Sequence, residues 1–318
     1  MKLIIQIPCL NEADSLPVTL AALPRRVTGC DSVEWLVIDD GSSDETAAVA
    51  RRHGVDHVVR HPANRGLAAA FMTGLDAAIG LGADIIVNTD ADNQYDARDI
   101  ETLVRPIIEK RAEFVIGARP ISLIAHFSWI KRHLQKLGSL VVRLASRTTV
   151  ADAPSGFRAI TRDVALRLNV FNAYTYTLET IIQAGRSNIR VLSVPIRTNP
   201  DLRPSRLVKS NLGYIMRSLG TIVRIFATYR PMLFFWLLGT FFAVAGLVAG
   251  VRFLIYASLG HGNGHVQSVV FGAACMIIAF LLFVLGFLAD LMATNRRLLE
   301  RIEGRVRKLE LDRAGDSP

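Results

Sequence analysis

Two long stretches without a charged residue lie in the last third of this 318-residue chain. Met232 to Val251 is 20 residues long, and Gln267 to Ala289 is 23 residues long. At about 1.5 Å per helical residue, each can span a hydrocarbon layer of roughly 30 Å. Helices buried in a large soluble core can have the same composition, but two such stretches in close succession favour membrane helices. The sequence therefore predicts a two-helix transmembrane hairpin within 229–293, with helices over about 231–254 and 267–289.

The net charge of +9 is concentrated beside these stretches. Residues 197–230 hold seven Arg or Lys against one acid, the tail 294–318 is rich in arginine, and the link 256–266 has neither Arg nor Lys. Because basic residues remain on the cytoplasmic side, we expect a multi-pass protein of the cell (cytoplasmic) membrane. The N-terminal domain, 1–228, and the tail would both be cytoplasmic. The basic charge is thus assigned to a lipid membrane and not to nucleic acid.

Short apolar runs alternate with helical patterns across the first 200 residues. The runs typical of buried strands are Leu3 to Ile7, Val33 to Ile38, Ile85 to Val87, Phe114 to Ile116 and Val191 to Ile196. Helical patterns occupy Leu16 to Leu23, Asp44 to Arg52 and Gly66 to Leu81. Such alternation predicts an α/β domain with a mostly parallel sheet and helices on both faces.

A basic amphipathic segment follows within the same domain. Residues 114–151 contain no Asp or Glu, and apolar residues recur there at steps of three and four. This pattern favours a helix near 123–147 that lies in the membrane interface, and a second is expected near 205–226. An ordinary core-facing helix with a solvated basic side is the alternative.

Polar and acidic residues follow three of the predicted strands. Asn11 and Glu12 follow the first, Asp39-Asp40-Gly41-Ser42 follows the second, and Asp90-Ala91-Asp92 follows Ile85 to Val87. The carboxyl ends of parallel strands meet at one edge of a sheet, where open α/β folds bind ligands. Carboxylates at this spacing suit a hard divalent ion that completes its shell with water and phosphate oxygens. The series therefore indicates a nucleotide diphosphate and a metal, although either acidic motif alone is also typical of a solvated turn.

These segments resemble, in order, the sequence blocks of glycosyltransferase family 2, whose members have a GT-A (Rossmann-like) fold. The matching blocks are Ile7 to Glu12, Val37 to Thr46, Asn64 to Gly66, Asp90 to Gln94, Asp152 to Arg158 and Thr177 to Glu179. Together with the paired apolar stretches, they are most similar to polyprenyl-phosphate sugar transferases such as dolichyl-phosphate mannose synthase and bactoprenol glucosyltransferase. The Gln-x-x-Arg-Trp block of processive polysaccharide synthases in this family is absent from the sequence.

The resemblance implies a role for each matching position. The nucleotide-sugar contacts would be Pro8, Leu10, Glu12, Asp39 or Asp40, Arg65, Asp90 and Ala91. Asp92 and Gln94 would hold Mg²⁺ or Mn²⁺. Arg203 and Lys209 would bind the donor diphosphate and the acceptor phosphate, with Arg119 beside them. The family's Ser-Lys pair reads Ser205-Arg206 here, so either Arg206 or Lys209 would take the lysine role.

The implied reaction is an inverting, metal-dependent transfer of a hexose from a UDP- or GDP-linked sugar to a polyprenyl phosphate. The acceptor would be undecaprenyl, decaprenyl or dolichyl phosphate at the cytoplasmic membrane face. The lipid-linked sugar would serve cell-envelope glycan or glycoprotein assembly. A phosphate monoester is largely dianionic at neutral pH and needs little help from a base.

Two other functions remain open. A lipid or glycan hydroxyl acceptor would need a base, for which Asp152 is the candidate, although Asp152 could equally orient the acceptor or cap a turn. A non-catalytic, nucleotide-sugar-binding membrane protein would keep the same pocket.

The small-residue pair Gly246 and Gly250 within the first apolar stretch also permits a homo-oligomer.

Overall fold

The structure is a computed structural model that describes residues 1–120, 148–170, 176–200, 226–259 and 266–315, with single positions at 142, 143, 146, 220, 223 and 224. The chain divides into two compact units, one formed by Met1–Ser218 with Glu300–Pro318 and the other by Leu219–Leu299. The predicted interfacial helices near 123–147 and 205–226 lie almost entirely outside the described residues.

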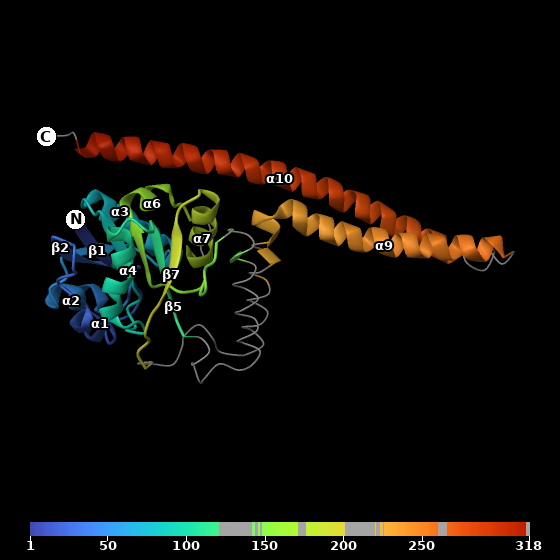
Figure 1. The fold of residues 1–318 in the computed structure, drawn as a ribbon. Coiled ribbons are helices and arrows are strands. Elements are labelled where there is room, and N and C mark those ends of the chain that lie inside the picture. The colour runs from blue at the N-terminus through green and yellow to red at the C-terminus, as the bar shows by residue number, and fades with distance from the viewer. Residues whose placement is uncertain are drawn as a thin grey trace. The chain divides into compact units, whose positions relative to one another are not determined.

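A seven-stranded sheet with the order β3-β2-β1-β4-β6-β5-β7 forms the centre of the first unit (Figure 1). The strands are β1 (Lys2–Cys9), β2 (Ser32–Asp39), β3 (His57–Arg60), β4 (Ile85–Asn88), β5 (Phe114–Ala118), β6 (Arg158–Thr161) and β7 (Val191–Pro195). β1 pairs in parallel with β2 and β4, whereas β6 runs antiparallel to β4 and β5. The sheet is mostly parallel, and all five predicted strands are present.

The apolar pattern of the sequence did not predict β3 and β6. Each has only four residues, and each contains charged or titratable side chains that break up an apolar run. β3 begins with His57 and ends with Arg60, and β6 begins with Arg158. Arg158 is fully buried, which its hydropathy alone does not suggest.

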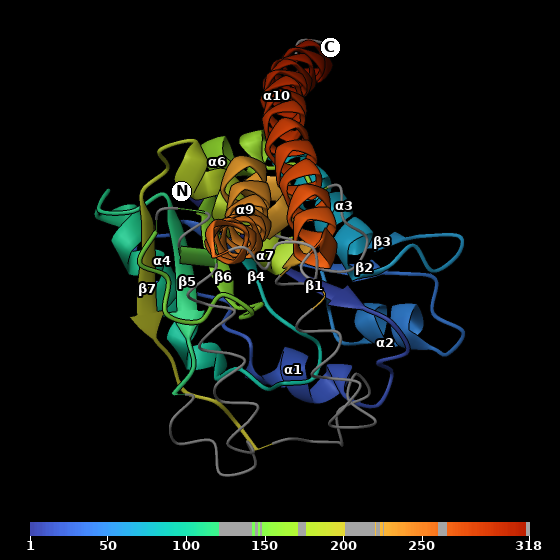
Figure 2. The ribbon, with the colours of Figure 1, turned by 90° about the vertical axis from the view of Figure 1, so that its right-hand side faces the viewer.

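Helices cover both faces of the sheet (Figure 2). They are α1 (Leu16–Ala22), α2 (Thr46–Arg52), α3 (Leu67–Gly80), α4 (Ile100–Ile108), α6 (Arg162–Arg167) and α7 (Tyr176–Arg186). Buried residues of α1, α2 and α4 join Leu3, Ile5 and Ile7 of β1 in one hydrophobic core. α3 packs on the opposite face, where a Cβ on Gly74 would lie 2.6 Å from Gln6 Oε1. This close approach explains why the middle of α3 carries a glycine.

The second unit contains the two long apolar helices that the sequence predicts. α9 (Pro231–Ser258) and the first part of α10 (Val266–Gly315) are long and apolar enough to cross a membrane. In their most apolar windows only 11% and 22% of residues are buried. A core helix of a soluble protein is mostly buried, so this exposure fits a lipid environment better. α10 continues without a break into the basic tail.

Glycines bring α9 and α10 into close contact. A Cβ on Gly246 would lie 2.9 Å from the carbonyl oxygen of Gly272, and one on Gly272 would lie 3.1 Å from the carbonyl oxygen of Gly246. Gly250, one turn further along α9, has no atom within 4 Å of a Cβ built on it. Gly246 therefore allows α9 to pack closely against α10, whereas the helix surface at Gly250 is open.

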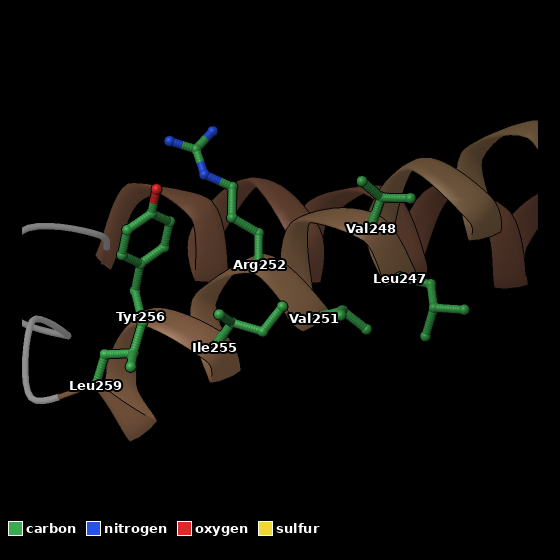
Figure 3. Close-up of a pocket in the computed structure, with 7 residues that line it drawn as sticks. All are labelled: Leu247, Val248, Val251, Arg252, Ile255, Tyr256 and Leu259. Atoms are coloured by element: carbon green, nitrogen blue, oxygen red, sulfur yellow. The ribbon is translucent and has the colours of Figure 1, made fainter.

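A shallow groove runs along the last turns of α9 (Figure 3). It is lined by Leu247, Val248, Val251, Arg252, Ile255, Tyr256 and Leu259. The guanidinium carbon of Arg252 lies 5.9 Å from the ring centroid of Tyr256. Arg252 comes 21 residues after Pro231, a rise of about 32 Å along a helix. If Pro231 lies at one boundary of a hydrocarbon layer of roughly 30 Å, the charge of Arg252 reaches the opposite boundary, a depth that long basic side chains favour.

Candidate active site

The carboxyl ends of β1, β2 and β4 meet at one edge of the sheet. In the β1–β2 register Cys9 pairs with Asp39, and in the β1–β4 register Gln6 pairs with Asn88. The loops that carry Asn11 and Glu12, the Asp39-Asp40 pair and the Asp90-to-Gln94 segment therefore start side by side. This is the shared edge that the sequence predicts.

Asp39 and Asp40 differ in how many acceptor positions remain open. Both oxygens of Asp40 are occupied, because Oδ1 lies 2.7 Å from His61 Nδ1 and accepts from Arg65 N, while Oδ2 accepts from Gly66 N. Oδ1 of Asp39 accepts from Ser42 N, and among the described residues Oδ2 has one ionic contact, 3.1 Å from Arg60 Nε. Asp40 therefore holds the 61–66 loop, and Asp39 retains capacity for a ligand.

The loop after β1 is fastened to the loop after β2. Asn11 N donates to Ser42 Oγ and Glu12 N donates to Thr46 Oγ1, both at 2.9 Å. Asn11 has φ of +54°, a left-handed conformation that asparagine adopts more readily than most residues. These bonds place Glu12 beside the carboxyl end of β2, where Asp39 lies.

The remaining predicted nucleotide contacts surround this edge. Pro8 is buried within β1, Leu10 is half-buried, and Arg65 is exposed at the start of α3. Ala91 is buried, and its carbonyl accepts from Thr19 Oγ1 at 2.8 Å.

The segment after β4 turns sharply at the acidic residues. Asp92 Oδ1 accepts from Gln94 N at 3.1 Å, and Asn93 between them has φ of +55°. Burial, followed by the charge of Asp92, raises the pKa of Asp90 to about 6, while Arg119 and Arg158 act in the opposite direction. Two carboxylates that repel each other favour a bound dication.

The oxygen ligands available here fit a magnesium- or manganese-type ion. Among the described residues no group of three or more His, Cys, Asp and Glu side chains could hold a metal. Carboxylates near Asp92 would therefore supply only part of the coordination shell, and a substrate diphosphate and water would supply the rest. Hard divalent ions at phosphate-transfer sites are commonly held in this way.

Arg119, which is half-buried, forms an ion pair with the buried Asp152. Arg119 Nε donates to Asp152 Oδ2 at 2.7 Å and Nη2 donates to Oδ1 at 3.1 Å. Burial alone would lower the pKa of Arg119, but the hydrogen bonds to Asp152 outweigh burial and raise this pKa above its ordinary value. Arg119 therefore stays cationic, and both oxygens of Asp152 are engaged in orienting it.

Gly156 is a site residue whose role the sequence does not reveal. A Cβ there would lie 3.0 Å from both carboxylate oxygens of Asp90. Gly156 N donates to Tyr95 Oη at 3.0 Å, and its carbonyl accepts from Asn88 Nδ2 at 2.9 Å. The sequence block around Ser155 and Gly156 resembles that of the family, but the contact with Asp90 follows only from the fold.

Arg158 places a second positive charge behind the acidic loop. Its guanidinium is fully buried and donates to Thr180 Oγ1 at 2.7 Å and to the carbonyls of Ser155 and Thr177. Burial lowers its pKa, while the charge of Asp90 acts in the opposite direction. Neither Arg158 nor Tyr95 was predicted as a site residue. Arg203, Arg206 and Lys209 lie outside the described residues.

The family model described as Glycosyl transferase family 2 matches residues 4–168. This match covers more than half of the chain. The chain belongs to glycosyltransferase family 2. It is therefore a glycosyltransferase, and the alternative of a non-catalytic nucleotide-sugar-binding protein is set aside. The predicted GT-A fold is confirmed.

Individual relatives and solved structures agree with the family. An uncharacterized glycosyltransferase of Mycobacterium bovis is 34% identical over 196 residues, covering 61% of this chain and 84% of the relative. The polyprenol monophosphomannose synthase of Mycolicibacterium smegmatis is 26% identical over 227 residues, covering 68% and 84%. The structure of Mycobacterium tuberculosis glucosyl-3-phosphoglycerate synthase with Mn²⁺ and UDP superposes with a TM-score of 0.54 at 20% identity, covering 72% and 79%. This last likeness concerns the fold alone.

Proposed function

We propose that this family member transfers a hexose from a nucleotide sugar to a polyprenyl phosphate at the cytoplasmic face of the membrane. The observation that carries the proposal is a glycosyltransferase site with a half-buried cationic Arg119 paired to Asp152, in a chain with two long exposed apolar helices. Similarity to a polyprenol monophosphomannose synthase supports the same acceptor class. An acceptor held in the membrane by its apolar chain would present its phosphate to such a site.

The chemistry follows from the charges. An oxygen of the acceptor phosphate would bond to the anomeric carbon as that carbon's bond to the diphosphate breaks, which inverts the configuration. A divalent ion held by Asp92 and Gln94 would stabilise the negative charge on the departing nucleoside diphosphate. Arg119, fixed by Asp152, would bind phosphate oxygens, and Asp39 would accept hydrogen bonds from the nucleotide base.

The state of Asp152 favours a phosphate acceptor over a hydroxyl acceptor. A hydroxyl nucleophile needs a base with an open acceptor position near it. Both oxygens of Asp152 accept from Arg119, so this carboxylate acts better as a support than as a base. A phosphate monoester needs no such base.

The test uses membranes that contain the full chain. Radiolabelled GDP-mannose, UDP-glucose and UDP-N-acetylglucosamine would each be incubated with undecaprenyl, decaprenyl or dolichyl phosphate and Mg²⁺ or Mn²⁺. We expect one donor to give an organic-extractable product that mild acid cleaves. Asp92→Asn should lose at least about a hundredfold in rate. Asp84→Asn should not, because Asp84 is exposed and precedes the amino end of β4, away from the site.

Two results would refute the proposal. One is the absence of labelled lipid with every donor. The other is labelling only when a free polyprenol replaces its phosphate.

A further inference from the structure

The segment that follows β7 runs beside the acidic loop. Tyr95 and Thr198 form an antiparallel bridge, and Asp96 N donates to the carbonyl of Arg197 at 3.3 Å. Arg197 also binds the carboxylate of Asp99: its backbone N donates to Oδ2 and its Nη2 donates to Oδ1, both at 2.6 Å. The stretch 197–199 therefore lies against the chain immediately after Asp92.

Asn199 makes the contacts closest to the acidic residues. Its backbone N donates to the carbonyl of Gln94 at 2.9 Å. Its side-chain Nδ2 donates to the carbonyl of Asn93 at 2.9 Å and to that of Tyr95 at 3.3 Å. One residue thus binds three consecutive carbonyls, and 106 positions separate it from Asn93 in the sequence.

The part of the loop that Asn199 holds contains a left-handed turn. Asn93 has φ of +55°, a conformation that asparagine adopts more readily than most residues but that still depends on neighbouring contacts to select it. The direction in which Asp92 and Gln94 project depends on this turn, because they flank Asn93. A donor that holds the Asn93 carbonyl therefore acts on the two residues expected to bind the ion.

We propose that Asn199 is a positioning residue for metal binding: its side-chain amide fixes the Asn93 turn so that Asp92 and Gln94 converge on one ion. The inference rests on the metal site of the proposed function. Groups that orient metal ligands without touching the metal commonly change its affinity by about 10-fold to 100-fold when removed.

The experiment measures Mn²⁺ binding by electron paramagnetic resonance of the free ion. The full chain in detergent would be titrated with GDP or UDP present, and nucleotide binding in EDTA would be measured in parallel. Asn199→Ala removes the amide, and Asn199→Leu removes it while keeping a similar volume. We expect both to raise the Mn²⁺ dissociation constant by about tenfold or more, with nucleotide binding in EDTA little changed.

Asn188→Ala is the matched control. Asn188 is exposed, follows α7 and has φ of +54°, so alanine there strains a turn and lowers stability away from the site. It should leave Mn²⁺ binding unchanged, which separates a loss of stability from a loss of positioning. Asn199→Ser keeps one donor group and serves if the other two variants do not fold. It should weaken Mn²⁺ binding by several-fold.

Mn²⁺ affinities within twofold of wild type in the folded Asn199 variants would overturn the inference, whatever their melting temperatures. Wild-type protein that binds no Mn²⁺ would overturn it as well. If Asn199 variants weaken Mn²⁺ binding while no polyprenyl phosphate accepts sugar, the proposed acceptor fails and the positioning role stands. If sugar transfer occurs but Mn²⁺ binding is insensitive to Asn199, only the positioning role fails.

Discussion

Asp39 and Asp40 are neighbours in the sequence, but their carboxylates have different partners. Asp40 binds His61 and two backbone N–H groups of the following loop. Asp39 is buried at the sheet edge, and within the described part of the chain its Oδ2 contacts the side chain of Arg60 alone, which is 56% exposed. A nucleotide base could replace Arg60 at Asp39 at a small desolvation cost, whereas a ligand of Asp40 would have to break the loop.

The ion pair between Arg119 and Asp152 predicts coupled effects of mutation. Asp152→Asn should lower the transfer rate by about tenfold to a hundredfold, because an amide cannot replace the charged, bidentate contact. Arg119→Lys should have a similar effect, and the double variant should be no worse than the worse single variant. Steady-state kinetics would check this. We expect the rate to fall at low acceptor concentration, because the main change should be a higher KM for the acceptor.

An opposite pattern would assign Asp152 a different role. If Asp152→Asn abolished transfer while Arg119→Lys remained near wild type, Asp152 would act as the base. Thermal unfolding of each variant provides the control for stability.

The elevated pKa of Asp90 predicts a pH dependence of metal binding. Below about pH 6 Asp90 becomes protonated, so its negative charge beside Asp92 is lost as the pH falls. Mn²⁺ affinity should therefore drop by about threefold to tenfold between pH 7 and pH 5. The titration should use an intact nucleotide sugar without acceptor, because its diphosphate does not titrate in this range. Asp90→Asn should bind Mn²⁺ weakly at both pH values. If this variant showed the same pH dependence of Mn²⁺ affinity as the wild type, the assignment to Asp90 would be contradicted.

At the scale of elements, two close contacts define the architecture. β6 returns antiparallel between β4 and β5, and its preceding turn brings Gly156 against Asp90. In the second unit, Gly246 and Gly272 bring the backbones of α9 and α10 together. In each contact a Cβ on the glycine would lie about 3 Å from the facing oxygen, so the facing group would have to shift to admit any other residue.

Gly246 and Gly250 provide a matched test of the helix contact. Gly246→Ala should lower the free energy of unfolding by about 1–3 kcal/mol, because its Cβ would press on the backbone of Gly272. Gly250→Ala should be neutral or slightly stabilising, since no atom lies near its Cβ position. Thermal unfolding in detergent would measure both. Equal effects of the two substitutions would show that α9 and α10 do not pack through Gly246.

At the scale of the whole molecule, a sugar-transfer domain and two apolar helices share one chain. The distribution of Arg and Lys predicts that the tail and the N-terminal domain face the cytoplasm, and that the link between the helices faces outward. This arrangement would bring a soluble cytoplasmic donor and a membrane-held acceptor to the same enzyme.

Cysteine labelling would test the orientation. Asn263→Cys, in the link, should react with a membrane-impermeant maleimide on intact cells, whereas Ser317→Cys, in the tail, should react only after permeabilisation. Cys30→Ser would serve as the background, because Cys9 and Cys275 are buried and Cys30 is partly exposed. The reverse labelling pattern would contradict the predicted orientation.

The amino-acid sequence is sufficient to predict the strands β1, β2, β4, β5 and β7, the order of the acidic motifs, the family and the two apolar helices. The strands and the apolar helices follow from local periodicity and hydropathy, which short segments carry on their own. The family follows from the resemblance of the sequence blocks to those of glycosyltransferase family 2. The sequence could not reveal β6, because four residues that begin with a buried arginine have no apolar signal.

Which residues meet at the site depends on the three-dimensional fold. The pairing of Arg119 with Asp152, the approach of Gly156 to Asp90 and the contact of Asn199 with the Asn93 turn join residues that are 33, 66 and 106 positions apart. No local pattern marks such contacts, because they depend on how the sheet orders its strands and where each loop returns. The acidic residues were therefore predictable, whereas the groups that orient them were not.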